Sequence, residues 1–137
     1  MTIQSIARRT LTTLALSTAV LAGLTAVPAS AGEIVKANME AYKKAASAKK
    51  PIIMHVHASW CPVCAKQTPI LESLMKEEEF KDVVVFTIDY DADKALVDQL
   101  EVKTQSTLIA AKGPTEVERI AGITDKEKIR SFIRKTL

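Results

Sequence analysis

From residue 32 onward, apolar residues alternate between two patterns, helical spacing in some segments and short unbroken runs in others. Helical spacing predicts amphipathic helices, and short apolar runs predict strands buried on both faces. The predicted elements are, in chain order, a helix over 34–49, a strand over 52–57, a helix over 61–79, a strand over 83–88, a helix over 92–100, strands over 107–111 and 116–120, and a last helix through Ile129, Phe132 and Ile133. This order predicts an α/β fold with a mixed, four-stranded central sheet flanked by helices on both faces.

Polar residues at the element ends predict where the helices begin and the chain turns. Asp91 is placed to cap the helix over 92–100, and Thr124 with Glu127 three residues later forms a capping-box pattern before the last helix. The Lys112-Gly113-Pro114 segment predicts the turn that joins the last two strands as a hairpin.

The first 31 residues have the pattern of an export signal. Arg8 and Arg9 form a basic start, the 17 residues 11–27 carry no charge, and Ala29 and Ala31 supply small residues at positions −3 and −1 of a cut. We therefore predict a cleavable signal peptide over 1–31 and one domain over 32–137, located in the periplasm or another extracytoplasmic compartment. A retained anchor is the alternative, because about 17–25 apolar residues span a bilayer. Whether the Arg8-Arg9 pair directs twin-arginine or Sec export stays open.

The charge balance excludes some classes of partner. The chain has 19 basic and 16 acidic residues, and the signal removes two arginines and no acidic residue, which leaves a mature charge of +1. A near-neutral domain gives no basis for a nucleic-acid or anionic-membrane partner. We expect a monomer.

The two cysteines, Cys61 and Cys64, are the candidate reactive groups. An exported domain that uses disulfides as staples usually carries more cysteines, placed far apart, and a pair this close gains little from constraining the unfolded chain. At a helix start, backbone N–H groups and the helix dipole lower the pKa of a thiol. Cys61 is therefore the predicted nucleophile and Cys64 the resolving thiol, with Pro62 suited to the first helical turn and Trp60 offering a flat apolar surface to a substrate peptide. A purely structural disulfide is the alternative.

Residues 58–69, Ala-Ser-Trp-Cys-Pro-Val-Cys-Ala-Lys-Gln-Thr-Pro, resemble the active-site segment of the thioredoxin family. Residues 86–89, the pairs 107–108 and 112–113, and Gly122 resemble that family's second core strand, its hairpin and the glycine before its last helix. The resemblance implies a redox-active disulfide between Cys61 and Cys64, protein dithiol or disulfide substrates, an extracytoplasmic redox partner and no bound cofactor. It also places Trp60, Pro62, Val63, Gln105 and Ser106 where the family contacts substrate.

The sequence departs from the family pattern at several positions. His55 stands where the family has a buried aspartate that moves protons for the second cysteine, so His55 is a candidate for proton transfer. Val85 stands where a lysine is often found, Pro62-Val63 replaces Gly-Pro, and the family's N-terminal strand is missing or vestigial. These departures leave the redox direction, reductase or oxidase, open.

Ser106 is the sharpest of these departures, because it replaces the family's cis-proline. A cis bond before a residue other than proline costs about 2.5–4 kcal/mol, so we expect a trans Gln105–Ser106 bond. The Ser106 hydroxyl or N–H could then reach the Cys61 sulfur. Alternatively, Ser106 is a tolerated loop substitution without a chemical role.

His55 and His57 support a second hypothesis from another class. With Cys61 and Cys64 they form a His-x-His-x3-Cys-x2-Cys cluster, and two imidazoles with two thiolates suit zinc or copper. The chain would then be a metal-binding or metal-delivery module. Strand histidines need not converge with two thiols at a helix start, however, and a buried strand histidine is more commonly a neutral core residue.

Overall fold

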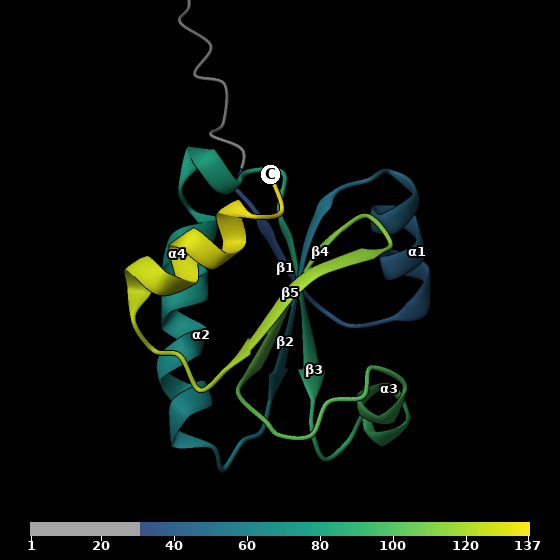
Figure 1. The fold of residues 1–137 in the computed structure, drawn as a ribbon, viewed down its shortest axis with the longest axis vertical. Coiled ribbons are helices and arrows are strands. Elements are labelled where there is room, and N and C mark those ends of the chain that lie inside the picture. The colour runs from purple at the N-terminus through teal and green to yellow at the C-terminus, as the bar shows by residue number, and fades with distance from the viewer. Residues whose placement is uncertain (1–30) are drawn as a thin grey trace, which may run out of the picture.

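A computed structural model describes residues 31–137 of the chain, and within them the chain forms five strands and four α-helices (Figure 1). The elements are, in order, β1 (Glu33–Lys36), α1 (Met39–Ser47), β2 (Pro51–His57), α2 (Pro62–Met75), the short 3-10 helix η1 (Glu78–Phe80), β3 (Val84–Asp89), α3 (Lys94–Gln99), β4 (Thr107–Lys112), β5 (Thr115–Ala121) and α4 (Lys126–Arg134). The predicted α/β class and the mixed sheet are confirmed.

The strands form one sheet in the order β1-β3-β2-β4-β5. Strands β1, β3 and β2 are parallel, β4 is antiparallel to β2, and β5 forms the predicted hairpin with β4. Figure 1 shows α2 and α4 on one face of the sheet and α1 and α3 on the other. Because strand side chains alternate, Ile53 of β2 packs under α2 and α4, whereas Ile52 and Met54 pack on the opposite face. The central strands are thus buried on both faces.

The prediction of four strands is wrong by one, because residues 33–36 form an additional edge strand. Strand β1 pairs with β3 in the register Ile34 to Val85. Its side chains are mostly exposed, so it lacks the apolar run by which the inner strands were predicted. The first helix begins at Met39 rather than at residue 34, because Asn38 is extended and its side chain accepts a hydrogen bond of 2.8 Å from the Ala41 N–H.

Two predicted helix caps are also wrong by one or two positions. Asp125, not Thr124, caps α4, and its carboxylate accepts a hydrogen bond of 2.9 Å from the Lys128 N–H. Asp93, not Asp91, occupies the cap position of α3. In both cases two residues of a capping type stand close together in the chain, and local sequence alone does not distinguish them.

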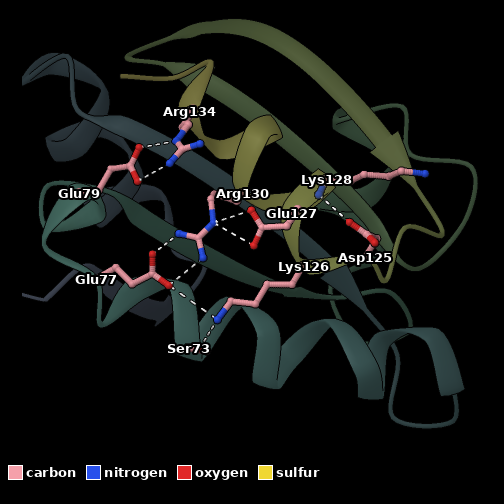
Figure 2. Close-up of polar contacts among 9 residues, drawn as sticks. All are labelled: Ser73, Glu77, Glu79, Asp125, Lys126, Glu127, Lys128, Arg130 and Arg134. Carbon is pink, nitrogen blue, oxygen red and sulfur yellow. Dashed lines mark hydrogen bonds and ion pairs between the residues drawn. The ribbon is translucent and has the colours of Figure 1, made fainter.

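Ion pairs fasten the last helix to the end of α2 and to η1 (Figure 2). The Arg130 guanidinium of α4 binds Glu77 and Glu127, and Arg134 binds Glu79. Arg130 is the most enclosed of these groups, with 15% of its side chain exposed. These contacts close the α2–α4 face of the sheet at the end far from the α2 N-terminus.

Within residues 31–137, no helix is both long enough and apolar enough to cross a membrane. The predicted signal peptide, and the anchor considered as its alternative, fall almost entirely on residues 1–30, which lie outside the described residues.

Candidate functional site

The two cysteines lie at the N-terminus of α2, directly after the central strand β2. Cys61 is the N-cap residue, Pro62 occupies the first helical turn, and the Cys64 N–H donates a hydrogen bond of 3.2 Å to the Cys61 sulfur. Each cysteine is 2% exposed, and both are free thiols. The pair is therefore described in its reduced, dithiol form.

The surroundings separate the acidities of the two thiols. Burial opposes ionisation of Cys61, but hydrogen bonding from the Cys64 thiol, from the N–H groups of Cys64 and Val63 and from the Gln105 side chain outweighs it and lowers the pKa of Cys61. Burial raises the pKa of Cys64, and its bond to Cys61 raises it further. Since the thiolate is the attacking species, this asymmetry favours Cys61 as the first nucleophile and keeps Cys64 protonated.

Ser106 closes the site opposite the cysteines in an unusual backbone conformation. The Gln105–Ser106 bond is trans, as predicted, and Ser106 has a φ of 60°, in the left-handed region that residues other than glycine rarely adopt. Its carbonyl accepts hydrogen bonds of 3.1 Å from the Gly122 N–H and of 3.1 Å from the Gln67 side chain. Its N–H favours the thiolate of Cys64 rather than that of Cys61, so the predicted contact with the Cys61 sulfur is wrong.

His55 lies beneath α2 and is 2% exposed. Its Nε2 lies 3.2 Å from the Gln67 carboxamide oxygen. Burial, with a smaller contribution from neighbouring His57, lowers the pKa of His55 to about 4, although the bond to Gln67 opposes this. The imidazole is therefore neutral near pH 7. Within residues 31–137 its hydrogen bond is to Gln67 and not to Cys64, so a direct proton transfer between His55 and Cys64 has no contact to support it.

Trp60 forms the exposed flank of the site. The indole is 60% exposed, and its Nε1–H donates a hydrogen bond of 2.7 Å to Asp91. Asp91 follows β3, and the Asp89 side chain accepts its backbone N–H. The indole is thus held by a residue 31 positions away in the sequence, and it presents an apolar surface beside the buried thiols.

Comparison with known proteins agrees with this geometry. The family model described as thioredoxin matches residues 33–135. The chain belongs to the thioredoxin family. The thioredoxin of Chlamydia muridarum (strain MoPn / Nigg) is 34% identical over 84 residues, which are 61% of this chain and 80% of that protein. Mouse mitochondrial thioredoxin is 29% identical over 91 residues, 66% of this chain and 54% of that protein, so the match spans about half of that relative's length.

A solved structure shows the same relationship in three dimensions. The crystal structure of Trxlp from Edwardsiella tarda EIB202 has a TM-score of 0.72 and 32% sequence identity, and the comparison covers 74% of this chain and 98% of that one. A mutant thioredoxin from Halobacterium salinarum NRC-1 has a TM-score of 0.65 at 25% identity, with 82% of this chain and 95% of that one covered. The thioredoxin fold is therefore established for residues 31–137 on sequence and on structure.

The structure brings the predicted site residues of this thioredoxin-family domain together at the N-terminal end of α2. Val63 packs against the two cysteines, Pro62 is exposed beside them, and Gln105 reaches Cys61. Their roles in substrate binding, and the roles of Cys61 and Cys64 in exchange, remain predictions that this arrangement supports.

Two residues of the site were not predicted as such. Asp91 was interpreted as a helix cap, whereas its carboxylate holds Trp60. Gln67 is fully buried and joins His55 to the carbonyls of Ser106 and Ile123. Its signal in the sequence is a polar residue within the apolar stripe of α2, four positions before buried Leu71, because a buried carboxamide requires partners.

The four residues of the metal-site hypothesis do not gather around one point. Within the described part of the chain, no three histidine, cysteine, aspartate or glutamate side chains form a group that could hold a metal ion. The rings of His55 and His57 face one another with centroids 5.5 Å apart on the sheet, while the two thiols lie at the helix start. The geometry thus gives no support to a zinc or copper module.

Proposed function

We propose that the protein is an exported thiol–disulfide oxidoreductase that exchanges disulfides with protein substrates through Cys61 and Cys64. The observation that carries the proposal is the asymmetry of the pair. Hydrogen bonds favour the thiolate of Cys61 at the helix start, whereas Cys64, one turn later, stays a protonated thiol within reach of it.

In the reducing direction, the thiolate of Cys61 attacks one sulfur of the substrate disulfide. A bond forms between the Cys61 sulfur and that sulfur, the substrate S–S bond breaks, and the other substrate sulfur leaves as a thiolate that takes up a proton. Cys64 then loses its proton and attacks the Cys61 sulfur, which breaks the mixed disulfide and closes a Cys61–Cys64 disulfide. Two electrons pass to the substrate, which ends as a dithiol. An oxidase runs the same steps in reverse.

Substrate docking in this proposal uses the surface around Trp60, Pro62, Val63 and Gln105, because this surface adjoins the cysteines and is exposed or half-buried. The exchange steps themselves require no bound metal or cofactor, since the two sulfurs carry the electrons. The reaction instead needs a second redox partner, a thiol donor for a reductase or an oxidant for a disulfide donor, in the same compartment.

The export component of the proposal rests on residues 1–31, with their basic start, uncharged run and Ala-Ser-Ala cut site. N-terminal sequencing of the protein from cell fractions tests it. A mature N-terminus at Gly32 outside the cytoplasm is expected, and full-length chain recovered in the membrane would replace the signal with an anchor.

Turnover with a model protein disulfide tests the activity. With dithiothreitol as the electron source, the purified protein is expected to accelerate reduction, and Cys61→Ser to abolish the acceleration. A glutathione titration of the Cys61–Cys64 pair then assigns the direction, because a strongly reducing potential means reductase and an oxidising one means disulfide donor. Undiminished turnover by Cys61→Ser would overturn the proposal.

A further inference from the structure

The Gln67 side chain is fully buried and makes three contacts with three separate parts of the fold. Its Nε2 group lies 3.1 Å from the Ser106 carbonyl oxygen and 3.0 Å from that of Ile123, and its Oε1 lies 3.2 Å from Nε2 of His55. Gln67 therefore joins α2 to β2, to the loop before β4 and to the loop before α4. No step of the exchange chemistry described above uses it.

These contacts determine which way round the carboxamide lies. Carbonyl oxygens only accept hydrogen bonds, so the NH₂ end of Gln67 must face Ser106 and Ile123. Its oxygen then faces His55, and because that oxygen only accepts, Nε2 of His55 must carry the proton. In a neutral imidazole only one ring nitrogen is protonated, so Nδ1 of His55 is left as the basic atom.

The position of His55 gives that basic atom access to water. Within residues 31–137, Nδ1 of His55 has no hydrogen-bond partner, and it is not among the atoms sealed from solvent without one. His55 lines a cavity of about 210 Å³ together with His57, Thr68 and Glu72, and the Thr68 hydroxyl donates to the Cys64 carbonyl. His57 and Glu72 are the titratable groups that share this cavity with His55.

The other end of Gln67 acts beside Cys64. It holds the Ser106 carbonyl, and the N–H of the same residue favours the Cys64 thiolate. A single side chain thus fixes the two groups that flank the resolving thiol, one on the strand below and one on the loop opposite.

We propose that Gln67 is a positioning residue of the exchange site, which holds His55 as the tautomer protonated on Nε2 and fastens the Ser106 peptide beside Cys64. The proposal rests on the disulfide exchange proposed above. When Cys64 attacks the mixed disulfide, the proton that it releases passes through water in the cavity to Nδ1 of His55 and from there to solvent. Gln67 touches neither substrate nor sulfur, and its effect falls on the second step, the attack by Cys64.

The resting protein supplies the first test, which needs no turnover. Nitrogen NMR of the wild-type His55 ring near pH 7 is expected to show a single tautomer with the proton on Nε2. A ring protonated on Nδ1, or an even mixture of tautomers, overturns the proposal. Because this measurement does not depend on activity, it separates failure of the positioning role from failure of the exchange function.

Two variants divide the role of Gln67 into its parts. Gln67→Leu removes all three contacts, and we expect mixed tautomers of His55 and a rate of Cys64 attack about two- to tenfold lower, the change that loss of an ordinary hydrogen bond brings. Gln67→Glu keeps an acceptor for His55 and loses the donors to Ser106 and Ile123. We expect it to keep the Nε2–H tautomer, to raise the pKa of His55 above its present value of about 4, and to slow Cys64 as well.

The matched control is Gln99→Leu, the same substitution at an exposed position of α3 on the opposite face of the sheet. Attack by Cys64 is measured as release of substrate from a preformed Cys61 mixed disulfide, across pH, and the alkylation rate of Cys61 serves as the reference. The proposal requires both Gln67 variants to slow release while Cys61 alkylation stays within about twofold and Gln99→Leu matches the wild type. A folded Gln67→Leu protein that keeps the wild-type tautomer and release rate overturns it.

Discussion

Replacing Ser106 with proline restores the residue that the thioredoxin family usually has there, and the structure predicts that it destabilises this protein. Ser106 has a φ of 60°, whereas the proline ring fixes φ near −65°. The peptide must therefore rotate, and its carbonyl turns away from the two donors that it now accepts, the Gly122 N–H and the Gln67 carboxamide.

The size of the loss follows from those contacts. The Gln67 donor is fully buried, and leaving it without a partner costs about 1–3 kcal/mol. Gly122 is exposed, so its N–H can turn to water and the net loss there is about 0.5–1.5 kcal/mol. Release of the left-handed conformation returns roughly 1–2 kcal/mol, the cost of that conformation for a residue with a Cβ. We therefore expect Ser106→Pro to lower the free energy of unfolding by about 1–3 kcal/mol.

Denaturant unfolding of the reduced protein measures this difference, with Ser106→Gly as the matched control. Glycine adopts a φ of 60° without strain and keeps the carbonyl contacts, so the gain in strain and the entropy lost by glycine nearly cancel and stability stays within about 1 kcal/mol of the wild type. A Ser106→Pro variant as stable as the wild type would refute the assignment of the left-handed, doubly accepting peptide.

Three further predictions concern the ion pairs, the exposed indole and the first thiol. Arg130→Met should lower the Tm most near neutral pH and progressively less as the pH falls through the pKa of Glu77, which Arg130 holds below its ordinary value of 4.5; an equal loss at every pH contradicts this. Asp91→Ala should free the chain's single tryptophan, Trp60, and raise KM for a protein disulfide about two- to tenfold with little change in kcat, while Trp60 fluorescence reports the released indole. Iodoacetamide labelling of Cys61 should persist at pH values well below the ordinary thiol pKa of 9.0, and a labelling midpoint at or above 9.0 would be inconsistent with the hydrogen bonds at the helix start.

The inner strands and the cysteine site could be predicted from the sequence because their signals are local. Strands β2 and β3 are buried on both faces, so each is an apolar run, and the turn at Gly113 marks the hairpin of β4 and β5. The spacing of Cys61 and Cys64, between a strand and a helix, determines their geometry almost by itself. Strand β1 escaped because an exposed edge strand carries neither an apolar run nor a clear alternation.

The contacts that complete the site could not be predicted, because they join residues far apart in the chain. Trp60 and Asp91 are separated by 31 positions, and Gln67 and Ile123 by 56. A polar residue in an apolar helical stripe signals that partners exist, but only the packed fold shows which carbonyls they are. The same limit applies to Ser106, whose trans bond followed from the cost of the cis form, while the direction of its N–H depended on a left-handed φ that no local pattern announced.

Trapping the covalent intermediate tests the central claim most directly. Cys64→Ser, incubated with an oxidised protein substrate and analysed by mass spectrometry without reductant, is predicted to accumulate a one-to-one mixed disulfide on Cys61, because the first attack proceeds and the resolving thiol is gone. Cys61→Ser, treated in the same way, is predicted to accumulate little or none, since the pKa of Cys64 is raised and its thiol is buried. An adduct that forms on Cys64 in preference to Cys61, or on neither, would contradict the account.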